Sequence, residues 1–176
     1  MPEAPNDVCS ISIPHTGTYF TIRLFTDAGF GETSLFSPLW RPNPTIYHGH
    51  MIKAGQIERA LELAEIMPLV IPFRHPYRVE HSWNVRARPL DEMFECYRTL
   101  ITRFLPLKPY LMPIDSDRRA EVLARISASI GVRLTTDGSV VNGMKNTHKM
   151  RMDEFTPSKK VIELAKSLEP VMAELY

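Results

Sequence analysis

Short apolar runs alternate with amphipathic segments along this chain of 176 residues. The runs 8–13 and 68–73 each have the length of one buried strand. Residues 55–66 carry apolar side chains at positions 57, 60, 61 and 64, the spacing of an amphipathic helix, and residues 18–26 also have a helical pattern. This alternation predicts an α/β protein, a three-layer sandwich with a central, mainly parallel sheet and a ligand site beyond the carboxyl ends of the strands.

The remaining segments complete this architecture. Further strands are predicted within 44–47 and 110–115, and further helices over 76–86, 90–104 and 117–130. Residues 27–32 are expected to be a flexible stretch before a proline-rich connector. A terminal helix interrupted at Pro170 packs either on its own domain or on a second subunit. We expect one domain over 1–176, with 156–176 as a helical tail.

Composition limits the classes of function. A net charge of +1 gives no field for nonspecific binding to nucleic acid or to an anionic membrane, and no stretch approaches membrane-spanning length. Cys9 and Cys96 lack motif spacing, which favours reduced core thiols. The amino-terminal residues 1–7 are polar and do not resemble a signal peptide, so a cytoplasmic location is expected.

The first candidate site is the segment Pro14-His15-Thr16-Gly17-Thr18-Tyr19-Phe20, directly after the first predicted strand. A tight turn between a strand and a helix aims several backbone N–H groups at one point, which attracts phosphate or sulfate. The nucleotide loop G-x-x-x-x-G-K-[ST] is absent, which disfavours a generic ATPase or GTPase. The segment resembles the phosphosulfate loop of sulfotransferases, P-K-S-G-T-T-W, with His15 in place of Lys and Thr16 in place of Ser.

A second segment follows the strand at 68–73. Arg74, Pro76 and Ser82 have the spacing of the sulfotransferase motif R-[ND]-P-x-x-x-x-x-S, which binds the 3′-phosphate of the cofactor. Arginine presents a planar fork of donors to phosphate, and proline suits a first helical turn. Alternatively, Arg74 is a solvated charge at a strand end and Ser82 an ordinary helix residue.

A third segment, His48-Gly49-His50, follows the short strand predicted at 44–47. Cytosolic sulfotransferases have K-T-H here, and the resemblance places their catalytic base at His50 and their lysine at His48. A neutral imidazole accepts a proton near neutral pH. The alternatives are two ordinary loop histidines or a metal-binding pair, although further ligands are not evident in the sequence.

Weaker resemblances concern the last quarter of the chain and the aromatic residues. Residues 141–149 resemble the segment G-x-W-K-N, which makes Lys145, and less so Asn146, a candidate phosphate ligand; a polar surface loop is the alternative. Phe20 takes the place of the loop tryptophan that lies against adenine. Trp40 and Trp83 are candidates for the cofactor or acceptor pocket, or, for Trp83, for the core.

The resemblance implies a P-loop-like sulfotransferase fold and transfer of a sulfuryl group from 3′-phosphoadenosine 5′-phosphosulfate (PAPS) to a hydroxyl or amine. The acceptor would be a small molecule or an exposed macromolecule, with no metal and with a homo-oligomer possible. In this scheme His15 and His48 stabilise the leaving phosphate as cations while His50 is the base, which predicts a bell-shaped pH–rate profile. Two alternatives stay open: a noncatalytic nucleotide-binding module, and a small-molecule kinase that places Mg²⁺ with Asp115.

Overall fold

The computed structural model describes residues 7–39, 43–136 and 155–176. Its centre is a sheet of five parallel strands in the order β2-β3-β1-β4-β5. The strands are β1 (Val8–Ser12), β2 (Gly31–Ser34), β3 (Thr45–His50), β4 (Leu69–Phe73) and β5 (Tyr110–Pro113). The predicted α/β class and parallel sheet are therefore confirmed.

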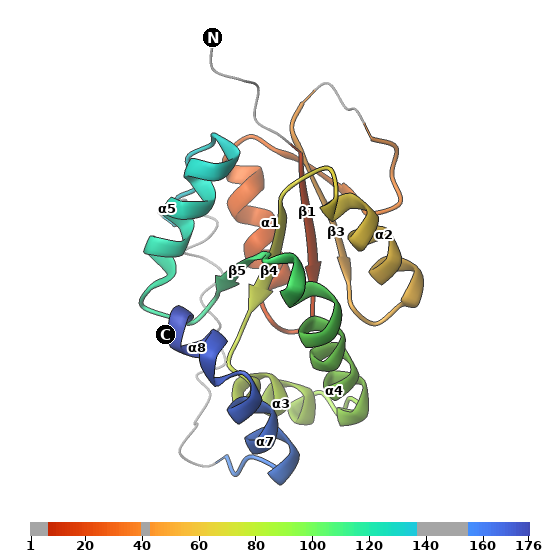
Figure 1. Ribbon diagram of the computed structural model, residues 1–176, viewed down its shortest axis with the longest axis vertical. Helices are drawn as coiled ribbons and strands as arrows, with labels where there is room; N and C mark the ends of the chain where they lie inside the picture. Colours follow the sequence, from red (N-terminus) through yellow and green to blue (C-terminus); the bar gives the residue numbers. More distant parts are fainter. Residues whose placement is uncertain (1–6, 40–42, 137–154) are drawn as a thin grey trace.

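Helices connect the strands and cover both faces of the sheet. The α-helices are α1 (Thr18–Asp27), α2 (Ala54–Ala64), α3 (Pro76–Val85), α4 (Leu90–Thr99), α5 (Arg119–Ile130), α7 (Lys159–Ser167) and α8 (Glu169–Leu175). Helices α1 and α5 lie on one face of the sheet and α2 and α4 on the other, while α3 and α7 lie beyond the carboxyl ends of the strands (Figure 1). This arrangement is consistent with a three-layer sandwich.

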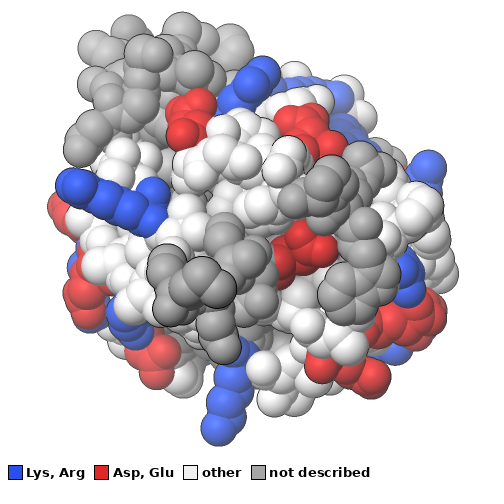
Figure 2. Space-filling model, turned by 90° about the horizontal axis from the view of Figure 1, so that it is seen from above, with Lys and Arg blue, Asp and Glu red and all other residues white. Residues whose placement is uncertain are grey.

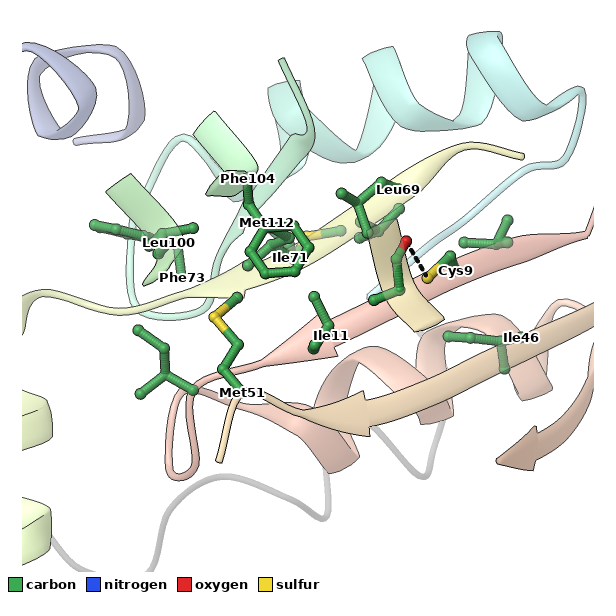
Figure 3. Packing of buried hydrophobic residues seen from close by; sticks show 14 of the residues in the cluster. Cys9, Ile11, Ile46, Met51, Leu69, Ile71, Phe73, Leu100, Phe104 and Met112 are labelled. Atoms are coloured by element: carbon green, nitrogen blue, oxygen red, sulfur yellow. Dashed lines mark hydrogen bonds between the residues drawn. The ribbon is translucent and has the colours of Figure 1, made fainter. Parts of the chain in front are cut away.

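The core lies on both faces of the sheet, and one part of it fills the space toward the layer that contains α2 and α4. Ile11, Ile71 and Phe73 of the sheet pack with Leu100 and Phe104, which belong to a π-helical turn after α4 (Leu100–Phe104) (Figure 3). All five side chains are buried. The β-branched and aromatic residues of the central strands are thus shielded from water on this face.

Both cysteines belong to this core. The thiol of Cys9 donates to the carbonyl oxygen of Ala60 in α2 at 3.9 Å, as drawn in Figure 3, and the thiol of Cys96 in α4 donates to the carbonyl oxygen of Met51 at 3.3 Å. Burial raises the pKa of each thiol to about 12. Both thiols are free and fully protonated at neutral pH.

Most predicted elements agree with the structure to within a few residues, but the stretch 27–32 does not. Its expected flexibility is wrong, because Gly31 begins β2, which pairs with β3 over four residues. Strand β2 is a mostly exposed edge strand, so its sequence Gly-Glu-Thr-Ser carries no apolar signal. Strand β3 is also longer than predicted and includes His48 and His50. The predicted helix 90–104 is divided, since α4 ends at Thr99 and the π-helical turn follows.

The C-terminal tail packs on its own chain. The backbone N–H of Ser158 donates to Glu80 Oε2 of α3 at 3.0 Å, and the Ser158 hydroxyl caps α7 by accepting from the N–H of Val161 at 3.2 Å. The helix breaks at Leu168, and Pro170 lies in the first turn of α8. The predicted interruption near Pro170 is therefore confirmed, and the packing on α3 requires no second subunit.

The described helices include none that is long and apolar enough to span a membrane. Figure 2 looks onto the end of the sheet where the strands begin, and there Lys and Arg side chains are interspersed with Asp and Glu side chains. Such mixing agrees with the net charge of +1.

Candidate functional site

The candidate site lies where strands β1 and β4 separate. Their pairing within the described strands is limited to Cys9 with Leu69 and Ser10 with Val70, whereas β1 pairs with β3 as far as Ser12 and His50. Pro72 in β4 has no N–H to donate, so the hydrogen bonds between β4 and β1 do not continue past this residue. The chain also continues from β1 and from β4 toward opposite edges of the sheet. The tips of β1 and β4 therefore flank the switch point at which open α/β sheets bind ligands.

The loop after β1 is a tight turn that only a glycine satisfies at its end. Thr16 is buried, and its N–H and hydroxyl both donate to the carbonyl oxygen of Ile13, at 3.2 and 2.6 Å. Gly17 has φ +103°, and a Cβ at this position would lie 2.5 Å from Cγ1 of Ile114. Another residue here would suffer both a left-handed backbone and a collision. The Thr16 hydroxyl, a predicted cofactor ligand, is committed to shaping this turn.

Helix α1 begins directly after this glycine. The first hydrogen bond of the helix runs from the N–H of Thr21 to the carbonyl oxygen of Gly17 at 3.0 Å, so the amides of residues 18–20 have no acceptor within the helix. No acidic residue stands in this first turn. These amides and the helix dipole favour an anion in front of the loop.

Arg74, at the tip of β4, reaches this loop. Its Nη1 donates to the carbonyl oxygen of His15 at 3.5 Å, and its Nε donates to Asp115 Oδ2 at 3.4 Å. The hydroxyl of buried Tyr97 donates to the carbonyl oxygen of Arg74 at 3.0 Å. A largely buried guanidinium is thus held between Asp115 and the β1 loop, while Tyr97 fixes the backbone of Arg74. The structure brings together the two segments that the sequence places 59 residues apart.

Trp83 connects helix α3 to the same loop, and Ser82 precedes it in the helix. Trp83 is fully buried and donates from Nε1 to the carbonyl oxygen of Pro14 at 3.2 Å. The hydroxyl of Ser82 accepts from Arg86 Nη1 at 2.7 Å. Trp83 therefore belongs to the core and supports the loop, while Ser82 lies on the same helix with its hydroxyl next to a cation.

His50 ends β3 and lies beside β1. Its Nδ1 is 2.9 Å from Ser12 Oγ, which in turn is 2.7 Å from Thr18 Oγ1, and its backbone N–H donates to Gln56 Oε1 at 2.9 Å. Burial, His48 and Arg88 lower its pKa, and a hydrogen bond to the backbone of Ser12 partly offsets this effect. The ring is therefore neutral at pH 7.

The hydrogen bonds of Ser12 are compatible with the tautomer of His50 that a base requires. The Ser12 hydroxyl donates to the carbonyl oxygen of Gly49 at 3.3 Å, which leaves its oxygen to accept from another group. With the ring N–H on Nδ1 facing Ser12, the lone pair of Nε2 is available. His50 then has the form that a general base requires.

His48 occupies a different position. It lies two residues before the tip of β3, and its Nε2 is 3.9 Å from Glu32 Oε1 of the edge strand β2. Burial lowers its pKa more than Glu32 raises it. Its described ionic partner therefore lies on the side away from β1, and in the free protein His48 does not carry the fixed positive charge expected of it.

His15 is also neutral in the free protein. Burial, Arg86, Arg88, His50 and Arg74 lower its pKa from the ordinary 6.5 to about 4. Its Nε2 is buried without a hydrogen-bond partner among the described residues, and its ring meets Trp83 edge-on with 6.0 Å between centroids. Three arginines thus act on the charge of His15, so the positive charge near the loop comes from arginines.

Three residues of this site have no motif in the sequence. They are Ser12, which holds His50, and Arg86 and Arg88, which follow the last residue of α3. The sequence could have drawn attention to the arginine pair, because two cations shortly after the helix with the predicted phosphate motif increase the local positive charge. Their direction depends on the turn that follows the helix, which no motif specifies.

Other predicted site residues are exposed, contact a residue outside the site, or fall outside the described residues. Tyr19 is 75% exposed, and the ring of Phe20 lies 5.0 Å from the Arg119 guanidinium. Lys145, Asn146 and Trp40 lie outside the described residues. Among the residues that are described, no group of three or more His, Cys, Asp or Glu side chains could hold a metal ion.

Comparisons with known proteins do not identify a relative. No protein-family model matches the chain, and searches of curated proteins and of solved structures find no match. The function therefore has to be argued from the geometry and chemistry of these residues.

Proposed function

We propose that the protein is a sulfotransferase with a P-loop-like fold, which transfers a sulfuryl group from PAPS to a hydroxyl or amine acceptor. The observation that carries this proposal is the convergence of three strand tips. The β1 loop supplies unpaired amides, Arg74 at the β4 tip contacts that loop, and His50 at the β3 tip lies next to Ser12 and Thr18. An anion site, a second cationic site and a base are the parts that sulfuryl transfer requires.

The two phosphate groups of the cofactor would bind on either side of the gap between β1 and β4. The amides of residues 18–20 and the Thr18 hydroxyl face the 5′-phosphosulfate. Arg74 and Ser82, which come from β4 and α3, face the 3′-phosphate. Charge-assisted hydrogen bonds from a largely desolvated guanidinium are the stronger class of hydrogen bond.

The transfer step is an in-line displacement. The acceptor oxygen or nitrogen forms a bond to sulfur as the bond from sulfur to the bridging oxygen breaks, and that oxygen leaves with the electron pair as part of the 5′-phosphate. The acceptor proton passes to Nε2 of His50. Fixed donors around the loop stabilise the growing charge on the phosphate without reorganisation.

A metal-dependent kinase fits these residues less well. Asp115 accepts from Arg74 and Arg78, at 3.4 and 3.2 Å, and from the hydroxyl of Tyr176. A Mg²⁺ ion at this carboxylate would have to displace two guanidinium groups. The loop also lacks the lysine of ATP-binding loops. A noncatalytic nucleotide-binding module would keep the anion sites but would not depend on His50.

Calorimetry and a transfer assay together test the proposal. Adenosine 3′,5′-bisphosphate should bind more tightly than ATP, and Arg74→Ala should weaken its binding about 10- to 100-fold, as loss of a charge-assisted contact does. Arg98→Ala, which removes an exposed arginine paired with Glu95 on α4, is the matched control and should change nothing. Transfer of labelled sulfate should be lost in His50→Gln while bisphosphate binding persists. Equal affinity for ATP, or binding independent of Arg74, would overturn the assignment.

A further inference from the structure

The loop lacks one positive charge that the proposed reaction would use. Sulfotransferases have lysine at the second position of this loop, where this chain has His15. The ring of His15 lies edge-on to Trp83, and burial together with the arginines described above lowers its pKa, so the imidazole is neutral. A leaving phosphate gains negative charge as the S–O bond breaks, and a neutral imidazole does not balance it.

A cation lies against the same tryptophan. The guanidinium carbon of Arg88 is 4.6 Å from the centroid of the Trp83 ring, and Trp83 itself donates to the carbonyl oxygen of Pro14 in the loop. Arg88 and His15 therefore both contact one fully buried indole. Because the indole is tied to the loop, the position of Arg88 is tied to the loop as well.

The backbone after α3 directs Arg88 to this place. Ala87 has φ +49°, a left-handed conformation that an alanine adopts only at a cost, and the N–H of Arg88 donates to the carbonyl oxygen of Trp83 at 3.0 Å. The turn folds the chain back over the helix it has just left. Glu92 accepts from Arg88 Nη2 at 3.3 Å, which holds the side chain while leaving about a third of it exposed.

We propose that Arg88 supplies the positive charge that stabilises the leaving 5′-phosphate, in place of the lysine missing from the β1 loop. This inference rests on the proposed sulfotransferase function. In the reaction, the acceptor bonds to sulfur, its proton goes to His50, and the bridging oxygen departs on the phosphate with one additional negative charge, which Arg88 balances. The charge of Arg88 also lowers the pKa of both His15 and His50, so it acts within electrostatic range of the loop and of the proposed base.

Binding of inorganic pyrophosphate tests the cation directly, without assuming a cofactor. Calorimetry should show that Arg88→Gln weakens pyrophosphate binding about tenfold, that Arg88→Lys retains most of it, and that Arg98→Gln, which breaks an exposed Arg–Glu pair on α4, leaves it unchanged. Near-ultraviolet circular dichroism verifies that Trp83 stays packed in each variant. Unchanged pyrophosphate binding in Arg88→Gln, or no pyrophosphate binding by the wild type, would overturn the inference.

The transfer assay separates this inference from the proposed function. With PAPS and an accepted substrate, Arg88→Gln should lower kcat about 100-fold, the usual range for one fixed donor at a developing charge, with a smaller change in KM for PAPS. A wild type that binds pyrophosphate through Arg88 but neither binds the bisphosphate nor transfers sulfate would refute the sulfotransferase and the catalytic part of the inference. Full activity in Arg88→Gln would refute the role of Arg88 alone.

Discussion

Ser12 Oγ lies 2.9 Å from Nδ1 of His50, at the adjoining tips of β1 and β3. The same oxygen also contacts Thr18 of the following helix, so one hydroxyl connects His50 to the first turn of α1. If His50 is the base, its tautomer depends on this contact.

Removing the Ser12 hydroxyl should therefore impair the base more than binding. We expect Ser12→Ala to lower kcat about tenfold and to leave bisphosphate affinity within about twofold, since the lost contact orients a catalytic group. Steady-state kinetics and calorimetry measure the two effects. His81→Gln, a change of a half-buried histidine on α3, is the control. Equal losses in kcat and affinity would show that Ser12 acts on the loop instead.

The dependence of kcat/KM on pH should have one limb. Burial lowers the pKa of His50 below its ordinary 6.5, so base activity should rise with pH in the acid range and level off by neutral pH. The cations near the loop are arginines, a residue type that stays charged in proteins. The pKa directions thus modify the bell-shaped profile expected from sequence. A falling limb between about pH 7 and 9, followed with labelled PAPS, would show that a cationic histidine acts after all.

A comparison of Gly17 with Gly29 distinguishes the cost of a left-handed backbone from the cost of a steric clash at Cβ. Both have left-handed φ values, +103° and +94°, but only at Gly17 would a Cβ meet another atom, namely Ile114 at 2.5 Å. Gly29→Ala should cost about 1 kcal/mol of unfolding free energy, and Gly17→Ala about 2–4 kcal/mol, because it adds overpacking to the same strain. Urea unfolding measures both, and similar costs would mean that Ile114 moves aside.

Acid should weaken the fold partly through His15. Its pKa falls from 6.5 to about 4 on folding, so the unfolded chain binds more protons between these values and stability declines as the pH falls through this window. Above about pH 6.5 this contribution is fully present. His15→Asn keeps a residue that tolerates the left-handed backbone and should flatten the decline between pH 6.5 and 4.5. An unchanged slope in urea titrations would assign the acid sensitivity to other groups.

The cap of α7 should contribute measurably to stability. Ser158→Ala removes the hydroxyl that accepts from the N–H of Val161, which should lower the unfolding free energy by about 1 kcal/mol. Ser167→Ala removes an exposed hydroxyl near the other end of the same helix and should cost less. Denaturant unfolding followed by circular dichroism compares them. A smaller loss in Ser158→Ala than in Ser167→Ala would contradict the capping role.

The parts of the fold that the sequence predicts well are those decided by burial. Strands β1 and β4 are buried along their whole length, and continuous apolar runs predicted both. Strand β2 escaped prediction because its stability comes from main-chain hydrogen bonds to β3, which carry no side-chain signature. Gly131, in contrast, ends α5 with φ +69°, as its glycine indicates.

The candidate site likewise contains residues that short segments identify and residues whose role depends on the fold. Gly17 and Arg74 were recognisable because each belongs to a short segment directly after a strand. The parallel order of the strands then brings these two segments together. Ser12 looked like an ordinary strand residue, because its role depends on register with His50. The position of Arg88 depends on the left-handed backbone at Ala87, which no sequence motif indicates. The neutral state of His15 results from burial and from charges distant in the chain.

The two buried thiols can report on local opening of the fold. Cys9 belongs to the sheet and faces α2, whereas Cys96 belongs to α4, so each reports on a different contact between layers. A thiol-reactive dye can modify either one only after its layer has separated. The ratio of the two labelling rates would show whether α4 separates from the core before α2 separates from the sheet, or whether both separate together.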